Sequence, residues 1–207
     1  CLLVSPHYFP NWAYRKWPHL KECSGTRLGF CIYDPHAKAV IENHLRTVVP
    51  IVRGNPALHS ICLSNEAEDS SFGKCRVLKA EWPKWLEARY GTVAAMNRKW
   101  NASYAAFSDV PLPESFRNNR RVPHLVDVMR FNREQFVGYH RWMAGIIHEI
   151  APEIPVHAKG GAQVVVEEMG EETNAMPQPP ALVSEFKVES LKFKVSEDEL
   201  FRWKKAM

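Results

Sequence analysis

The residues best suited to chemistry are Asn65 and Glu66, an amide and a carboxyl group side by side after a short apolar run. A carboxylic acid can protonate the leaving oxygen when a glycosidic bond breaks, while a second carboxylate acts from the other side of the sugar. A carboxyl group in a partly apolar, ring-lined pocket has a raised pKa, which suits the acid role. The neighbouring amide can hydrogen-bond the sugar 2-hydroxyl. The pair is compatible with glycoside hydrolysis, but by itself it is a weak signal, and capping at the start of a helix is the commoner explanation of such a pair.

Three further side chains are candidates for contacts with a sugar. His7 and His157 fall at the ends of expected strands, where their ring nitrogens can hydrogen-bond sugar hydroxyls. Trp12 lies in an expected ring-rich loop and can stack its apolar face on sugar C–H groups. Each residue also has a structural interpretation, since a lone histidine usually packs or faces solvent and Trp12 can anchor the loop in the core. We expect Asn65, His7, Trp12 and His157 to bind substrate.

The elements that position these residues alternate between short apolar runs and longer amphipathic stretches. Buried strands are expected at residues 2–5, 61–63 and 154–158. A helix is expected from Asp34, whose carboxylate can cap free N–H groups, with Pro35 in the first turn. Further helical spacing occurs at residues 82–90, 92–100 and 136–150. The long connection between residues 101 and 121 predicts a loop.

This order of elements is that of an α/β protein with a parallel sheet joined by crossover helices. Polar residues at the carboxyl ends of strands are typical of the active face of a (β/α)8 TIM barrel. A complete barrel takes about 250 residues, and we expect only three strands before residue 160. The chain also begins at Cys1 rather than at an initiator methionine. We therefore expect a partial barrel, followed by a tail at residues 160–207 that the pattern assigns to no element.

The composition excludes several classes of protein. Hydrophobic residues make up 45% of the 207 residues, which excludes disorder for most of the chain. The net charge of +4 is too mild and too evenly spread to favour a nucleic acid as partner. No apolar run approaches the roughly 20 residues of a membrane helix. The sequence predicts neither a nucleic-acid partner nor a membrane partner, and it leaves the compartment open.

The cysteines are wide apart and odd in number. No pair has the C-x-x-C spacing of a zinc site, so unpaired thiols are the favoured interpretation. A bridge between Cys23 and Cys31 stays open. The five positions are Cys1, Cys23, Cys31, Cys62 and Cys75.

From about residue 2 to residue 159 the chain resembles the catalytic barrel of glycoside hydrolase family 42, the bacterial β-galactosidase type. The stretch "ICLSNE" at residues 61–66 is similar to the fourth-strand segment of that family, although many barrel glycosidases share Asn-Glu. The stretch "WLEARYGTVAAMNRKW" at residues 85–100 resembles a segment more particular to it. The similarity continues through residues 104–113 and 129–131, and residues 3–12 resemble the preceding strand and its Pro-Trp loop.

The resemblance implies that Glu66 is the general acid/base of a retaining mechanism and that Asn65 contacts the sugar at the cleaved position. It places residues 1–159 at about strands 3 to 5 of the barrel. It also implies a nucleophilic glutamate near the end of the seventh strand, which this stretch does not reach. Glu185 follows an apolar run, but too little chain separates it from the fifth strand.

The chain departs from the family in one respect. Some members carry a cysteine cluster soon after the Asn-Glu pair that binds structural zinc, whereas here only Cys75 lies in that region. We therefore expect no metal, and no cofactor is required. The resemblance implies a carbohydrate substrate and a homo-oligomer, such as a trimer.

Two alternatives stay open. The first alternative is a degenerate or carbohydrate-binding barrel without catalysis. The second is an enzyme that prefers a β-glucoside, β-fucoside or β-arabinoside. In either case we expect these 207 residues alone to be inactive, and to aggregate or stay partly unfolded, because an incomplete barrel leaves strand edges and apolar faces open.

Overall fold

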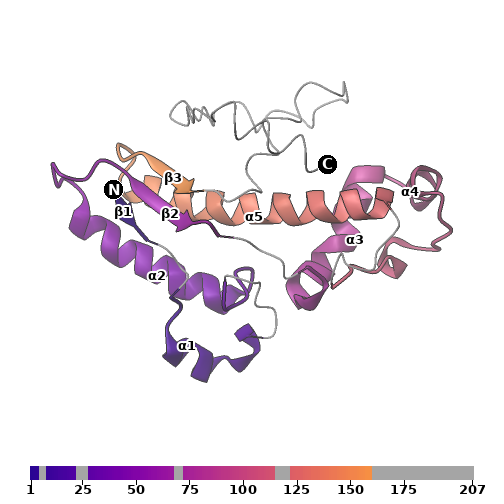
Figure 1. Cartoon of the computed structure of the whole chain (residues 1–207), viewed down its shortest axis with the longest axis horizontal. Coiled ribbons are helices and arrows are strands. Elements are labelled where there is room, and N and C mark those ends of the chain that lie inside the picture. Colours follow the sequence, from indigo (N-terminus) through magenta and orange to yellow (C-terminus); the bar gives the residue numbers. More distant parts are fainter. Residues whose placement is uncertain (5–7, 22–27, 68–71, 115–121, 160–207) are drawn as a thin grey trace, which may run out of the picture. The chain divides into compact units, whose positions relative to one another are not determined.

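The computed structural model describes residues 1–4, 8–21, 28–67, 72–114 and 122–159. Its strands form one parallel sheet in the order β1-β2-β3 (Figure 1). Leu3 lies opposite Cys62, and Cys62 lies opposite His157, so these three side chains share one face. The strands are β1 (Leu2–Leu3), β2 (Ile61–Asn65) and β3 (Val156–Lys159). The predicted α/β alternation with crossover helices is confirmed.

Local chemistry sets the start of two helices and the end of a third. The helices expected at residues 82–90 and 136–150 begin earlier, at Arg76 and Val122. The Asp34 side chain accepts the His36 N–H at 2.9 Å, and the Thr92 hydroxyl accepts the Ala95 N–H at 3.2 Å. Gly91 ends a helix with a positive φ of 69°, which glycine adopts without strain. The helices concerned are α2 (Pro35–Val52), α3 (Arg76–Tyr90), α4 (Val93–Trp100) and α5 (Val122–Ile150), with 3-10 turns at Pro18–Lys21, Phe72–Lys74 and Phe107–Asp109.

One predicted loop is wrong. The ring-rich segment around Trp12 contains a short helix, α1 (Asn11–Lys16), which places Trp12 in its first turn. Pro10 precedes the helix in an extended conformation, and the Ala13 N–H donates to the Pro10 carbonyl at 3.0 Å. The chain is therefore extended at Pro10 and helical from Asn11.

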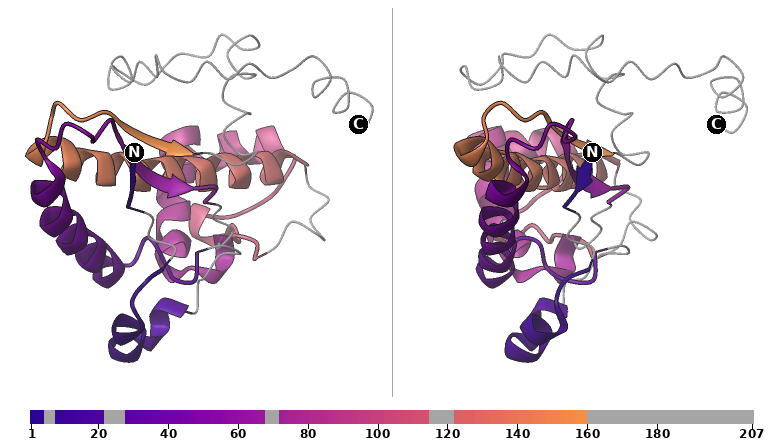
Figure 2. Two further views of the ribbon diagram at one scale, coloured as in Figure 1. Left: turned by 60° about the vertical axis from the view of Figure 1, so that its left-hand side comes forward. Right: turned by 90° about the vertical axis from the view of Figure 1, so that its left-hand side faces the viewer.

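The helices α2 and α5 lie together on one side of the sheet (Figure 2). Ile61 on β2 is buried among the core residues beneath them, and Leu2 and Val156 pack against the same cluster. The opposite face carries Leu3, whose surface is 49% exposed. The sheet thus has one face covered by helices and one face partly open.

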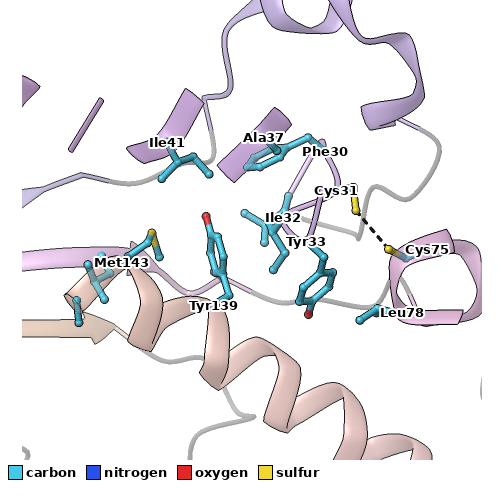
Figure 3. Packing of buried hydrophobic residues seen from close by; sticks show 14 of the residues in the cluster. Phe30, Cys31, Ile32, Tyr33, Ala37, Ile41, Cys75, Leu78, Tyr139 and Met143 are labelled. Atoms are coloured by element: carbon cyan, nitrogen blue, oxygen red, sulfur yellow. Dashed lines mark hydrogen bonds between the residues drawn. The ribbon is translucent and has the colours of Figure 1, made fainter. Parts of the chain in front are cut away.

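Aromatic and aliphatic side chains from three segments fill the core between the helices. Tyr139 extends from α5 toward Ile41 of α2, with Phe30 and Ile32 beside it (Figure 3). The Tyr139 hydroxyl is buried and has no hydrogen-bond partner among the described residues. Its burial raises the pKa of Tyr139 well above the usual value. The segment at residues 28–33 is therefore part of the core and joins α2 to α5.

The stretch at residues 85–100 has a structural explanation. Its Tyr90 hydroxyl and Trp100 indole both donate to Oδ2 of Asp127 on α5, the indole at 2.9 Å. Arg89 Nε lies 3.0 Å from the other oxygen of this buried carboxylate. The Asp127 carboxylate thereby links the three helices α3, α4 and α5.

Contacts divide the chain into two units, Cys1–Met169 and Gly170–Met207, and all described residues belong to the first. The predicted tail at 160–207 and Glu185 lie outside the described residues. The division into a barrel part and a tail therefore stays a prediction. In the part of the chain that the structure describes, no helix is both long and apolar enough to cross a membrane.

Candidate functional site

An irregularity in β2 aims Asn65 toward the open face of the sheet. Cys62 pairs with His157 and Asn65 pairs with Lys159, so three residue steps on β2 match two on β3. Without this bulge, Asn65 would face the opposite side from Cys62, because side chains alternate along a strand. The extra residue brings Asn65 to the same face as Cys62 and His157, and Asn65 is exposed there.

Glu66 follows directly and is held by the last residue of β3. Its N–H donates to the Lys159 carbonyl at 2.8 Å, and its φ of 50° lies in the left-handed region. Lys159 Nζ lies 3.3 Å from Glu66 Oε1. The Glu66 side chain is 42% exposed. A carboxyl group is therefore presented at the carboxyl end of a parallel strand, accessible from solvent and beside an ammonium group.

The bulge is anchored from the covered side of the sheet. Ser64 Oγ lies 2.8 Å from Nε2 of His140 on α5, and His140 Nδ1 lies 3.0 Å from the Phe136 carbonyl. Because the carbonyl can only accept, Nδ1 carries the proton and Nε2 accepts from the Ser64 hydroxyl. Burial lowers the pKa of His140, and the bond to Phe136 opposes that shift only in part. A neutral histidine thus fixes the residue just before Asn65.

The structure separates the other predicted sugar contacts. His157 shares the open face with Asn65, and its Nε2 lies 3.8 Å from Cys1 Sγ. Trp12 is 49% exposed on α1, where it lies beside Trp17. It lines a cleft of about 500 Å³ against α2, and neither Asn65 nor Glu66 lines that cleft. His7 lies outside the described residues. Their roles as sugar contacts stay predictions.

Sequence reasoning missed Lys159 and His140. Lys159 is a polar residue at the end of β3, just as Glu66 follows the end of β2. The pattern of polar residues at strand ends could therefore have predicted it. His140 falls inside a regular helical stretch, and nothing in the local sequence marks its partner 76 residues earlier.

One cluster of described residues has the composition of a metal site. His19 Nε2 lies 3.2 Å from one oxygen of Asp34, and His36 Nδ1 lies 3.0 Å from the other. The His36 N–H and the Arg76 guanidinium occupy the same carboxylate. Burial would raise the pKa of Asp34, but bonds from His36 and Arg76 outweigh it and lower that pKa. Because a cation would have to displace these donors, we assign the cluster to capping α2.

The described residues do not supply a complete ligand set for the structural zinc expected in some members of the family that the sequence resembles. Cys31 and Cys75 lie together. The cluster of three possible ligands among the described residues, His19, Asp34 and His36, includes neither cysteine. Structural zinc takes four ligands. These two thiols alone do not fit it, and the expectation of no zinc stays a prediction, because Cys23 lies outside the described residues.

The arrangement can supply half of a glycoside-hydrolase site. A partly exposed carboxyl group stands at the carboxyl end of a parallel strand, beside an exposed amide on the open face of the sheet. Helices cover the other face, as they do in the (β/α)8 barrels whose active sites lie at the strand ends. A carboxyl group at a strand end, with helices on the other face of the sheet, is the arrangement found in enzymes of the α/β barrel class.

The family follows from comparison. The model of glycoside hydrolase family 42, described as beta-galactosidase, matches residues 6–176, and the chain belongs to this family. A beta-galactosidase of Thermus thermophilus is 26% identical over an alignment of 162 residues, and the match covers 69% of this chain and 24% of that protein. An Arthrobacter beta-galactosidase is 25% identical over an alignment of 170 residues, and the match covers 70% of this chain and 23% of that protein. The chain thus spans about a quarter of the curated relatives it matches.

Solved structures agree on the fold. The beta-galactosidase from Bacillus circulans sp. alkalophilus matches with a TM-score of 0.65 and 18% identity, over 76% of this chain and 26% of that chain. An exo-carrageenase of the same family from Bacteroides ovatus matches with a TM-score of 0.66 and 24% identity, over 76% and 23%. Both are TIM-barrel-type glycoside hydrolases, and the parallel sheet with its helices resembles part of that fold.

Proposed function

We propose that residues 1–159 form strands 3 to 5, with their helices, of the catalytic barrel of a retaining β-glycosidase that hydrolyses terminal β-galactosides. The observation that carries the proposal is Glu66, which immediately follows β2 and is held there by Lys159, in a chain of this family. A partner carboxylate is required for hydrolysis. We assign it to a part of the protein outside the described residues.

In this mechanism Glu66 donates a proton in the first step and accepts a proton from water in the second. As the nucleophilic carboxylate attacks the anomeric carbon, Glu66 gives its proton to the glycosidic oxygen and the aglycone leaves. A water molecule then attacks the glycosyl-enzyme, and the Glu66 carboxylate takes the proton from that water. Asn65, exposed beside Glu66, would hydrogen-bond the sugar 2-hydroxyl. This bond strengthens as positive charge develops on the sugar ring.

The test compares Glu66→Gln with the parent in the protein that carries this chain. We expect hydrolysis of an aryl β-galactoside to fall by roughly 10²–10⁴-fold. An aryl group that leaves readily needs no proton, so such substrates should lose less. Azide needs no general base and should restore turnover by attacking the glycosyl-enzyme. Equal rates in the two proteins would end the assignment.

Glu81→Gln serves as the matched control. Glu81 pairs with Lys84 on the exposed surface of α3, so the same change of charge there should leave the rate unchanged. Substrate preference is measured by comparing rates on aryl β-galactoside, β-glucoside, β-fucoside and β-arabinoside. Carrageenan oligosaccharides are included because the Bacteroides ovatus neighbour is an exo-carrageenase.

The alternative is a carbohydrate-binding barrel without catalysis. Calorimetry that detects galactose binding while no member of the panel turns over would favour it. Measurable turnover that depends on Glu66 would exclude it.

A further inference from the structure

The sulfur atoms of two buried cysteines lie against each other. Cys31 Sγ and Cys75 Sγ are 3.3 Å apart (Figure 3), and the two residues are 2% and 0% exposed. Cys31 belongs to the core segment before α2, whereas Cys75 directly precedes the first residue of α3. The contact therefore joins two crossover regions that are 44 residues apart in the chain.

Backbone contacts hold both residues in place. The Cys31 N–H donates to the Leu20 carbonyl at 2.8 Å, and the Cys75 carbonyl accepts the Lys79 N–H at 2.9 Å in the first turn of α3. A disulfide needs its sulfurs about 2.05 Å apart. The sulfurs must therefore approach by about 1.3 Å to form the bond.

We infer that Cys31 and Cys75 form a disulfide bond that ties the segment before α2 to the start of α3. Two thiols lose two protons and two electrons to a small-molecule disulfide such as oxidised glutathione, which leaves as two thiol molecules. Because both sulfurs are buried, the exchange takes place during folding or local opening. Once formed, the bond is shielded from reductants. The bond differs from the Cys23–Cys31 pairing that the sequence left open.

Cys62 provides an internal comparison. It is also buried, but its Sγ lies 3.2 Å from the Ser64 carbonyl and therefore contacts an oxygen rather than a second sulfur. Burial alone thus does not single out Cys31 and Cys75. Their mutual contact does.

Tryptic peptide mapping distinguishes the pairings. The protein that carries this chain is folded in a glutathione redox buffer, its free thiols are blocked with N-ethylmaleimide under denaturing conditions, and it is then digested. Cleavage after lysine and arginine puts the three relevant cysteines into different peptides, which span residues 22–27, 28–38 and 75–76. We expect peptide 28–38 joined to 75–76, with the loss of two hydrogens, and both peptides separate and unlinked after dithiothreitol. A link from 22–27 to either peptide, or complete blocking of Cys31 and Cys75, would overturn the inference.

Thermal unfolding gives a second reading. The disulfide should raise the melting temperature of the oxidised protein over the reduced protein by roughly 5–15 °C. That difference should vanish in Cys31→Ser and in Cys75→Ser but persist in Cys62→Ser. If either serine variant fails to fold, the peptide map of the parent still decides. Zinc that copurifies with the parent at one equivalent, with Cys31 and Cys75 as thiolates, would contradict the disulfide.

Discussion

Lys159 contacts Glu66 twice, once through its carbonyl, which accepts the Glu66 N–H at 2.8 Å, and once through Nζ, which lies 3.3 Å from Oε1. The last residue of β3 thus fixes both the backbone and the side chain of the residue that follows β2. A general acid must approach the glycosidic oxygen to hydrogen-bond distance, so a group that orients its carboxyl affects the rate.

Replacing Lys159 by methionine should lower kcat on an aryl β-galactoside by about 10-fold, because the carboxyl group loses a partner that orients it. The backbone bond to Glu66 stays, so KM should change little. Steady-state kinetics in the protein that carries this chain measures both values. Lys84→Met, which removes an exposed lysine paired with Glu81 on α3, is the control and should leave kcat unchanged. An unchanged kcat in the Lys159 variant would show that the contact is incidental.

Asp127 should be among the residues most important for stability. Replacing it by alanine leaves the Tyr90 hydroxyl, the Trp100 indole and the Arg89 guanidinium without their shared acceptor. Such a loss of one partner in a buried charged cluster costs about 3–5 kcal/mol. Urea unfolding should show this decrease. Glu81→Ala breaks only an exposed pair and should cost less than about 0.5 kcal/mol. Similar costs in both variants would contradict a special role for Asp127.

The buried His140 predicts a loss of stability in mild acid. Burial lowers the pKa of His140, so the unfolded chain binds a proton more readily than the folded chain does. Its contribution to stability is therefore complete above the ordinary pKa of about 6.5 and is lost as the pH falls toward the lower folded-state value.

His140→Gln should consequently lose about 1 kcal/mol less stability between pH 7 and pH 5 than the parent does. Glutamine keeps an acceptor for the Ser64 hydroxyl, which limits other damage. Urea unfolding at both pH values measures the difference. His148→Gln changes an exposed histidine on the same helix and should follow the parent. Parallel pH dependences in the parent and His140→Gln would exclude His140 as the source.

Two glycines should respond to alanine in opposite directions. A Cβ on Gly73 would clash with the Leu112 carbonyl oxygen, and the Gly73 N–H donates to the Pro113 carbonyl at 3.0 Å. Gly73→Ala should therefore cost at least about 2 kcal/mol, since the facing backbone must move. Gly138 lies within α5 with open space around it, so Gly138→Ala should stabilise by about 0.5–1 kcal/mol. Differential scanning calorimetry of both variants checks the two signs.

The sequence by itself determined the features that depend on neighbours in the chain. Asp34 caps α2 as predicted, and Thr92 caps α4 in the same way, because a cap is satisfied within three residues. The apolar run before Asn65 forms a parallel strand, and polar groups stand at its end, because hydrophobic spacing and strand length are local signals. The family was also visible in the sequence, and the match over residues 6–176 confirms it.

Only the tertiary structure decided which distant groups meet. The bulge in β2 depends on pairing with β3, so no local pattern could show that Asn65 turns to the open face. The contact of Cys31 with Cys75, rather than a pairing judged from spacing, likewise depends on how two crossover regions pack. Lys159 reaches Glu66 because neighbouring parallel strands end at the same edge of the sheet. Such contacts arise from packing between elements far apart in the chain, which sequence spacing does not encode.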